Sequence, residues 1–384
     1  MKINIFGSTG IIGEKSLKLA KSYFPNIKIN LLVVNSNINK LIKQCEYYKP
    51  KYICIKKTIL INKIKNKISK KIKIIHHDNL FNFLKSNKSD LSILAISGYN
   101  ALDYFEPIVN NTKFLGLVNK EIIVSSGHLF KKKKYLNKTI IFPIDSEHFS
   151  LFYYFKNRKF DISKIKKIYL TASGGPFLNY KKSQLSNVTY KDAINHPKWK
   201  MGYKNSIDSA TLANKCLELI EAHYLFNIPY NKLDIKIHPQ SLIHSIIEYN
   251  DGFSMFNYFY NDMDIPILNF YNFSQKNSSF NVPKKFSLSK KLDLNFDIPD
   301  KEIFPIYKTF QKIANQGIEK KIMFNVINEY AVNLFKDIKI KFNDISHFVD
   351  KYISLDLKFK LTNIKNIIDF QSNVKNRLDN ENIF

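Results

Sequence analysis

The stretch Lys2-Ile3-Asn4-Ile5-Phe6-Gly7-Ser8-Thr9-Gly10-Ile11-Ile12-Gly13 decides the fold of the N-terminal part of the chain. It begins with an apolar run of strand length, and three glycines follow at the spacing GxxGxxG before a helical pattern starts. Glycines between a strand and a helix permit a tight turn and let a phosphate approach the amino end of the helix. The hydroxyls of Ser8 and Thr9 add possible donors. The stretch therefore predicts a nucleotide-binding loop, and its alternative is an ordinary strand–turn–helix connection.

Six more apolar runs follow in the first 145 residues, with helix-length segments between most of them. They span residues 27–34, 52–55, 72–75, 91–96, 114–118 and 139–144. Buried parallel strands read as continuous apolar runs of this kind. The alternation of strands and helices predicts a doubly wound α/β domain over residues 1–145.

The pattern changes after residue 145, and the rest of the chain divides into three parts. Residues 146–262 read as an α+β domain, with strands at 166–171, 235–237, 245–249 and 254–259 and a long helix beginning near Ser209. The last two strands flank Asn250-Asp251-Gly252, a hairpin turn signal. Residues 263–300 lack clear periodicity and predict a linker. Helical spacing over 301–384 predicts a C-terminal helical domain.

Composition narrows the classes of protein that the chain can belong to. The 384 residues are 45% hydrophobic, which indicates a folded protein. The net charge of +28 comes from lysines spread along the whole chain, which favours a solvated surface over a nucleic-acid partner. No run of about 18 residues is free of charge, so no membrane-spanning helix is expected. The three cysteines lack CxxC spacing and the amino terminus reads directly as a strand, so we expect a cytoplasmic protein.

Two carboxylates stand at the end of the last N-terminal run, in Asp145-Ser146-Glu147-His148. In an extended segment Asp145 and Glu147 point to the same side, and the carboxyl end of a strand in an open α/β sheet faces the ligand crevice. Two such oxygen ligands suit Mg²⁺ or Mn²⁺. The alternative is a helix N-cap at Asp145 or Ser146, and the motif alone leaves both open.

The segment 196–202, His-Pro-Lys-Trp-Lys-Met-Gly, contains the only tryptophan of the chain, Trp199. Bounded by Pro197 and Gly202, it reads either as a lid over a site or as a loop that buries Trp199. Asp208 or Ser209 is then expected to cap the long helix.

Asn214 and Glu218 are four residues apart on that helix and therefore share a face, with Lys215 beside them. Ser209, Asn214 and Lys215 offer hydroxyl, amide and ammonium donors, which suit a phosphate. Glu218 offers a third carboxylate for a metal ion. The alternative for these residues is a solvated helix face with a routine ion pair.

The second apolar run ends at Asn35-Ser36-Asn37, where an NAD-specific site would carry an acid for the ribose hydroxyls. The missing acid favours NADPH. No Arg or Lys stands at 35–37 to hold a 2′-phosphate, although Lys40 is close in sequence.

Several motifs occur together in a characteristic order, and they carry a resemblance to a known family. They are Gly7-Ser8-Thr9-Gly10-x-Ile12-Gly13, Asn119-Lys120-Glu121, Asp145-Ser146-Glu147-His148, Ser173-Gly174-Gly175-Pro176-Phe177, His196-Pro197-x-Trp199-x-Met201-Gly202, Asp208-Ser209-Ala210-Thr211, Asn214-Lys215, Glu218 and Ile237-His238-Pro239-Gln240-Ser241. With these motifs the chain resembles the 1-deoxy-D-xylulose 5-phosphate reductoisomerase family of the non-mevalonate isoprenoid pathway. The resemblance is dense from residue 91 to 260 and thinner after 265, where Asn325-Val326-Ile327-Asn328-Glu329 echoes a family motif.

The resemblance implies a Rossmann-like NADPH-binding domain, an α+β catalytic domain that also forms a homodimer, and a C-terminal α-helical bundle. It implies an NADP-dependent oxidoreductase and isomerase that makes 2-C-methyl-D-erythritol 4-phosphate from 1-deoxy-D-xylulose 5-phosphate. The reaction would be a metal-assisted retro-aldol/aldol rearrangement followed by hydride transfer. The implied cofactors are NADPH and one divalent cation, Mg²⁺, Mn²⁺ or Co²⁺.

The resemblance also assigns residues to roles. Asp145, Glu147 and Glu218 would hold the cation. The substrate would meet Lys120, Glu121, Ser146, Glu147, Ser173, His196, Ser209, Asn214, Lys215 and Glu218. Among these, the phosphate would be gripped by Ser173, Ser209, Asn214 and Lys215, and the catalytic residues would be Lys120, Glu121, Glu147 and His196. The closing flap would contain Trp199 and Met201. NADPH would meet Thr9, Gly10, Ile11, Ile12, Asn37, Asn119 and Gly202.

Two positions depart from the family pattern. Ile11 stands where a serine is usual, so only a backbone contact to phosphate is expected there. Asn35-Ser36 stands where glycine followed by Lys or Arg is usual, which weakens the expected grip on the 2′-phosphate of NADPH.

Overall fold

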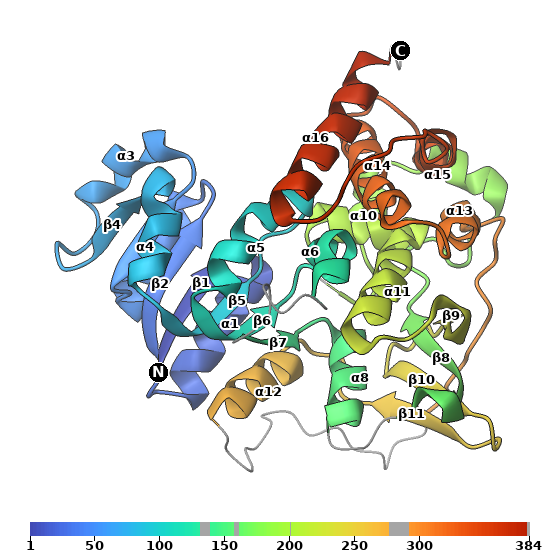
Figure 1. Cartoon of the computed structure of the whole chain (residues 1–384), viewed down its shortest axis with the longest axis horizontal. Helices are drawn as coiled ribbons and strands as arrows, with labels where there is room; N and C mark the ends of the chain where they lie inside the picture. Colours follow the sequence, from blue (N-terminus) through green and yellow to red (C-terminus); the bar gives the residue numbers. More distant parts are fainter. Residues whose placement is uncertain (131–138, 157–160, 200, 276–291, 382–384) are drawn as a thin grey trace.

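The N-terminal part of the chain forms a seven-stranded parallel sheet, as its apolar runs predict. The computed structural model describes residues 1–130, 139–156, 161–199, 201–275 and 292–381 (Figure 1). The strands are β1 (Lys2–Phe6), β2 (Lys28–Val34), β3 (Tyr52–Ile55), β4 (Lys73–His76), β5 (Ser89–Leu94), β6 (Thr112–Leu117) and β7 (Ile140–Pro143). Their order is β4-β3-β2-β1-β5-β6-β7, with parallel pairing throughout. The strand order reverses between β1 and β5, the switch point at which open α/β sheets bind ligands.

Helices cover both faces of this sheet. Successive strand residues point to opposite faces, so the continuous apolar strands make both faces apolar. Ile3 and Ile5 of β1 pack in one cluster with residues of α1 (Ile11–Tyr23) and α2 (Ile38–Tyr48). Phe6 packs on the other face, in a cluster with residues of α4 (Leu80–Ser86) and α5 (Leu102–Val109). The remaining N-terminal helices are α3 (Ile61–Lys65) and α6 (Lys120–Ser126). The doubly wound architecture is therefore confirmed.

A second, four-stranded sheet follows, as the α+β prediction requires. Its strands are β8 (Ile165–Ala172), β9 (Leu233–Ile237), β10 (Ile243–Tyr249) and β11 (Ser254–Tyr258), in the order β11-β10-β8-β9. The hairpin between β10 and β11 turns at Gly252, whose φ of 88° suits glycine. Helix α8 (Ser146–Lys156) packs on β10 and β11, and α9 (Tyr190–Ile194) precedes the helices of the site.

The prediction that a long helix begins near Ser209 is wrong. The structure has two helices, α10 (Tyr203–Thr211) and α11 (Ala213–Phe226), with Leu212 between them in the left-handed conformation (φ 69°). Asp208 is therefore a buried interior residue of α10 and does not cap a helix. The break is stable because the Leu212 side chain is buried, a tertiary contact that local sequence does not reveal.

The segment expected to be a linker begins with a helix, α12 (Asp264–Gln275). This helix packs against α1, and the Tyr271 hydroxyl donates to the Ser16 carbonyl oxygen at 2.9 Å. Lys15 of α1 forms ion pairs with Asp262 at 2.7 Å and Asp264 at 2.5 Å. The chain thus returns to the N-terminal domain after the second sheet. Residues 276–291 of the expected linker lie outside the described residues.

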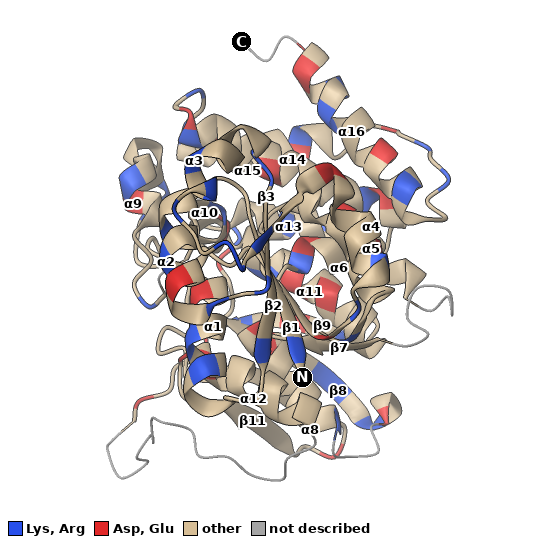
Figure 2. Ribbon diagram, turned by 90° about the vertical axis from the view of Figure 1, so that its left-hand side faces the viewer, with Lys and Arg blue, Asp and Glu red and all other residues tan. Residues whose placement is uncertain are grey.

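The C-terminal part is helical, as predicted, with α13 (Pro305–Ile313), α14 (Ile318–Lys336), α15 (Phe342–Tyr352) and α16 (Ile364–Asn380). Helix α11 lies between the second sheet and these helices (Figure 1). None of the described helices combines the length and apolar composition needed to cross a membrane. Lys and Arg residues are distributed over elements across the view of Figure 2, in line with a solvated surface.

Candidate active site

Three carboxylates from two distant parts of the chain converge at the centre of the molecule. Asp145 follows β7, Glu147 lies in the first turn of α8, and Glu218 lies on α11. One oxygen of each lies within 4.8 Å of the others. Three carboxylate oxygens at this spacing are a donor set that suits a hard divalent cation.

Two buried lysines stand among these carboxylates. The Lys120 ammonium lies 2.9 Å from Asp145 Oδ2 and 2.8 Å from Glu218 Oε1. The Lys215 ammonium lies 2.6 Å from Glu218 Oε2 and also pairs with Glu147. Burial disfavours the Lys120 ammonium, but the charges of Asp145 and Glu218 outweigh it and hold its pKa well above the usual value. The site is therefore built to bind positive charge, which fits a metal cation.

Two neighbouring polar side chains complete the cluster. Asn214 donates to Glu218 Oε1 at 2.5 Å and accepts from the Lys120 ammonium at 2.9 Å. Asn214 therefore lies against the carboxylates, although sequence reasoning expected it at the phosphate. The Ser146 hydroxyl donates to Glu147. Burial, followed by repulsion from Glu218, raises the pKa of Glu147 to about 7.

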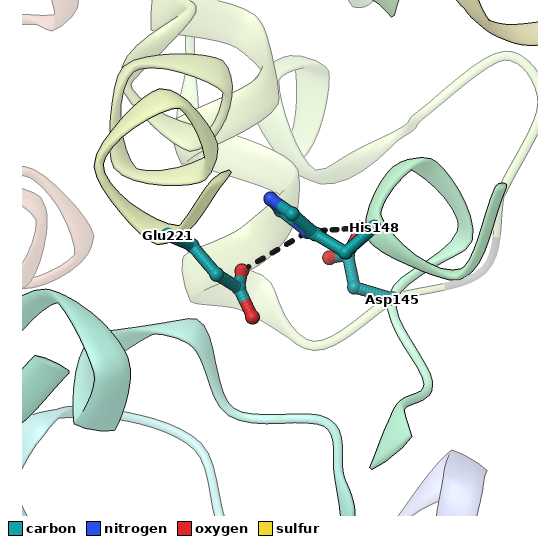
Figure 3. A group of neighbouring side chains, drawn as sticks. All are labelled: Asp145, His148 and Glu221. Atoms are coloured by element: carbon teal, nitrogen blue, oxygen red, sulfur yellow. Dashed lines mark ion pairs between the residues drawn. The ribbon is translucent and has the colours of Figure 1, made fainter. Parts of the chain in front are cut away.

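His148 supports this cluster from inside the protein, between Asp145 and Glu221 (Figure 3). Its Nδ1 lies 3.5 Å from Asp145 Oδ1 and 3.2 Å from Glu221 Oε2. Its Nε2 donates to the Glu218 backbone oxygen at 2.9 Å, because a carbonyl can only accept. Burial alone would lower the His148 pKa, but Glu221 and Asp145 raise it to about 9. Sequence reasoning missed Glu221, whose signal was its position one helical turn after Glu218.

We expect the metal-free protein to lose stability as the pH rises from about 6.5 to about 9, through the titration of His148. A folded-state pKa above the unfolded value stabilises the protein below pH 6.5, and this gain disappears as the pH passes the folded pKa. The loss should be on the order of a few kcal/mol. Urea unfolding with a chelator, at several pH values, measures it. The His148→Asn variant should lack this part of the slope; an identical slope in both proteins would contradict the assignment.

A second cluster forms around His196. Its Nδ1 accepts from the backbone amides of Lys198 at 3.2 Å and Trp199 at 2.9 Å, so Nε2 carries the proton. Nε2 faces the hydroxyls of Ser173 and Ser209, both at 3.1 Å. Burial, assisted by the charge of Lys215, lowers the His196 pKa to about 4. The cluster is therefore a neutral set of N–H and O–H donors at physiological pH, which suits a phosphate or hydroxyl group.

Glycines and the expected flap border this cluster. Gly174 and Gly175 follow β8 with φ of 85° and 68°, and a Cβ on Gly175 would lie 2.9 Å from the Ser209 backbone oxygen. This close approach brings Ser173 beside α10. Trp199 and Met201 are half-buried, and Lys200 lies outside the described residues. Trp199 is therefore not fully buried in the core.

Six of the seven residues expected at NADPH lie at the carboxyl ends of strands of the first sheet. Thr9, Gly10, Ile11 and Ile12 form the loop and first turn after β1, Asn37 caps α2 after β2, and Asn119 caps α6 after β6. Gly202 begins α10 with open space around its Cα.

The glycine loop is shaped for close approach to the first turn of α1. Gly7 has φ 87°, and a Cβ on Gly13 would lie 2.3 Å from the Gly7 backbone oxygen. Gly10 and Ile11 are exposed, so the first amides of α1 face outward to a ligand, which fits a pyrophosphate. Ser8 was expected to offer a hydroxyl, but its Oγ is buried and donates to Gln44 at 2.8 Å.

Glu121 does not join the carboxylate cluster. It pairs with Lys204 at 2.9 Å, and Lys204 pairs with Asp208 at 2.6 Å. Asp208 accepts a hydrogen bond from Asn328 of α14 at 2.7 Å. Next to Asn328, Glu329 accepts from the Tyr99 amide at 3.1 Å, beside the cofactor edge. The C-terminal helices thus support the site, which sequence reasoning did not predict.

Comparisons with known proteins agree with this geometry. Family models for 1-deoxy-D-xylulose 5-phosphate reductoisomerase match residues 3–127, and models of its C-terminal domains match 141–226 and 260–377. The reductoisomerase of Pelagibacter ubique is 39% identical, with 97% of this chain and 96% of the relative covered. That of Clostridium kluyveri is 37% identical, with 96% and 95% covered.

Solved structures show the same similarity. The reductoisomerase of Zymomonas mobilis in complex with NADPH superposes with a TM-score of 0.86 at 30% identity, covering 98% of this chain and 97% of that one. A DOX-P reductoisomerase in complex with NADPH, fosmidomycin and magnesium also gives 0.86, at 29% identity with 99% and 97% covered. Sequence similarity over nearly the full length and a shared fold support one conclusion: the chain belongs to the 1-deoxy-D-xylulose 5-phosphate reductoisomerase family.

Proposed function

We propose that this chain isomerises and reduces 1-deoxy-D-xylulose 5-phosphate to 2-C-methyl-D-erythritol 4-phosphate with the residues described above, as a step of non-mevalonate isoprenoid biosynthesis. The observation that carries the proposal is the convergence of Asp145, Glu147 and Glu218 beside the donor cluster of His196. NADPH in the Zymomonas relative and magnesium in a second relative support the same cofactors here.

The carboxylates are proposed to hold one divalent cation, which would polarise the substrate carbonyl as a Lewis acid when bound. Lys120 lies among these carboxylates, so its ammonium is placed to stabilise negative charge on a substrate oxygen. Ser146 and Glu147 are proposed to orient the substrate hydroxyls. NADPH would supply the hydride after the carbon skeleton has rearranged.

The substrate phosphate is proposed to bind at Ser173, Ser209 and the Nε2–H of His196, with the charge of Lys215 close to His196. Asn214, which bonds to Glu218 and Lys120, is proposed to act at the carboxylates instead. A neutral His196 donates to a phosphate without titrating near neutral pH. Trp199 and Met201 would close over the substrate and exclude water, which strengthens these polar contacts. Binding energy at the phosphate, remote from the reacting carbons, would help closure.

Glu121 is proposed to line the ligand site. Its carboxylate is held in place by the ion pair with Lys204. Burial raises the Glu121 pKa but the Lys204 ammonium outweighs it, and the net shift is downward. We therefore infer that Glu121 stays ionised and orients ligands, while Lys120 acts as a fixed positive charge.

We also propose the domain division expected from the sequence: 1–145 for NADPH, 146–262 for catalysis and 301–384 for the helical part. The chain is further proposed to act in the cytoplasm as a homodimer. Within the described part of the chain, strand β11 is an edge strand of the second sheet, and Phe253 and Phe256 beside and on it are 62% and 50% exposed. An exposed edge strand with aromatic side chains is typical of an interface between subunits.

Removal of divalent metal is expected to abolish turnover. The measurement is NADPH consumption with 1-deoxy-D-xylulose 5-phosphate after treatment with EDTA, followed by addition of Mg²⁺ or Mn²⁺. Activity should fall to background with EDTA and return with metal, because the carbonyl then loses its Lewis acid. Full activity in EDTA would mean that the carboxylates serve Lys120 and Lys215 alone, as in a metal-independent oxidoreductase.

A further inference from the structure

The carboxyl end of β2 lacks the positive charge that a 2′-phosphate needs. In doubly wound folds the adenosine ribose of a dinucleotide lies at this end of the second strand. Residues 35–37 are Asn-Ser-Asn, and the nearest lysine on α2, Lys40, pairs with Glu14 at 2.9 Å. The same segment also lacks an acid for the ribose hydroxyls of NADH. The residues that choose between the two cofactors must therefore lie on another element.

The neighbouring strand β3 brings two lysines to this place. β2 and β3 pair in parallel, with Val34 opposite Ile55. Past the strand ends the two segments stay side by side, because the Lys56 amide donates to the Val34 oxygen at 2.9 Å and the Lys57 amide to the Asn35 oxygen at 3.0 Å. The dipeptide Lys56-Lys57 thus lies directly beside Asn35-Ser36.

The two lysines are placed differently. Lys57 lies in the bend after β3, directly before the 3-10 helix Thr58–Leu60, and its backbone is tied to Asn35. The charge of Lys56 acts on Asp103 and His77, on the face of the sheet that α5 covers. Both are exposed, and among the described residues the Lys57 ammonium forms no ion pair with a carboxylate.

We propose that Lys57 binds the 2′-phosphate of NADPH and so gives this chain its preference for NADPH over NADH. The inference rests on the proposed function, since it assumes that the cofactor binds at the glycine loop. A lysine ammonium binds a phosphate as a point charge and needs no fork geometry, so a flexible side chain from the next strand suffices. The contact is exposed and should weaken with salt.

The test compares four full-length proteins: wild type, Lys57→Ala, Lys56→Ala/Lys57→Ala and Lys51→Ala. Lys51 is exposed at the amino end of β3, at the opposite edge of the sheet, so Lys51→Ala removes the same charge away from the cofactor. NADPH and NADH affinities are measured by nucleotide fluorescence. Calorimetry with 2′,5′-ADP and 5′-AMP then isolates the contribution of the 2′-phosphate without turnover.

Lys57→Ala should weaken binding of NADPH and 2′,5′-ADP by about tenfold, and the double variant by little more, because the Lys56 charge lies with Asp103 and His77. NADH and 5′-AMP should bind as in wild type, and Lys51→Ala should change neither. An unchanged NADPH affinity in the double variant, or an equal loss for NADPH and NADH, would overturn the proposal. If wild type binds neither dinucleotide, the proposed function itself fails. If wild type binds NADPH and the lysine variants bind it equally well, only this inference fails.

Discussion

Glu218→Gln is expected to lower turnover by about a thousandfold or more, with little change in NADPH affinity. Glutamine keeps the shape of the side chain but removes the charge that meets Lys120 at 2.8 Å and Lys215 at 2.6 Å. It also removes one of the three anionic ligands proposed for the cation. The NADPH loop lies on β1 and α1, so cofactor binding should stay within about twofold of wild type.

Steady-state kinetics with the sugar phosphate, together with a fluorescence titration of NADPH, measure both effects. The matched control is Glu248→Gln on β10, which breaks a partly exposed ion pair with Lys166 at 2.7 Å. That control should turn over as wild type does, because an exposed pair contributes little and lies away from the site. Normal turnover in Glu218→Gln would remove Glu218 from the catalytic cluster.

Lys204→Met should destabilise the protein by about 3–5 kcal/mol. Methionine fills the volume of the lysine stem, but it leaves the buried carboxylates of Glu121 and Asp208 without their shared partner. Burial disfavours the Lys204 ammonium, yet Asp208 and Glu121 raise its pKa far above the usual value, so the charge is present at every relevant pH. The measurement is the free energy of unfolding in urea.

The control for this change is Lys182→Met, which breaks a pair with Glu302 in which both side chains are mostly exposed, at 66% and 71%. Its effect on the free energy of unfolding should be small because solvent already screens the pair. A similar small loss for Lys204→Met would show that Glu121 and Asp208 find other partners. In that case the link from α10 to the C-terminal helices would not depend on this lysine.

The strands and the glycine loop could be predicted because they depend on the pattern of apolar residues and glycines over a few neighbouring positions. The seven apolar runs became the seven strands of the first sheet, shifted by only a few residues. The glycine loop took the strand–turn–helix form that its spacing indicates. Asp145 follows the last buried strand as expected, but Glu147 lies in the first turn of α8, so the expected extended segment is wrong there and the helix start is the alternative that holds. The expected linker was wrong at 264–275, although Ile267, Leu268 and Tyr271 already form a helical apolar stripe.

The sequence by itself determined the strands and helices of the first domain and the types of residue at the site, because these follow from patterns that repeat every two to four residues. The strand order, and with it the switch point between β1 and β5, comes from the tertiary structure. Only the tertiary structure decided which charges meet. Lys120 and Glu218 are 98 residues apart, and Asn328 and Asp208 are 120 apart. Such pairs depend on how helices from separate parts of the chain pack around α11. Once these charged and polar side chains are buried, each needs a partner, because an unpaired buried charge is strongly unfavourable. No local pattern records that requirement, and it explains why Lys204 and Glu221 were missed.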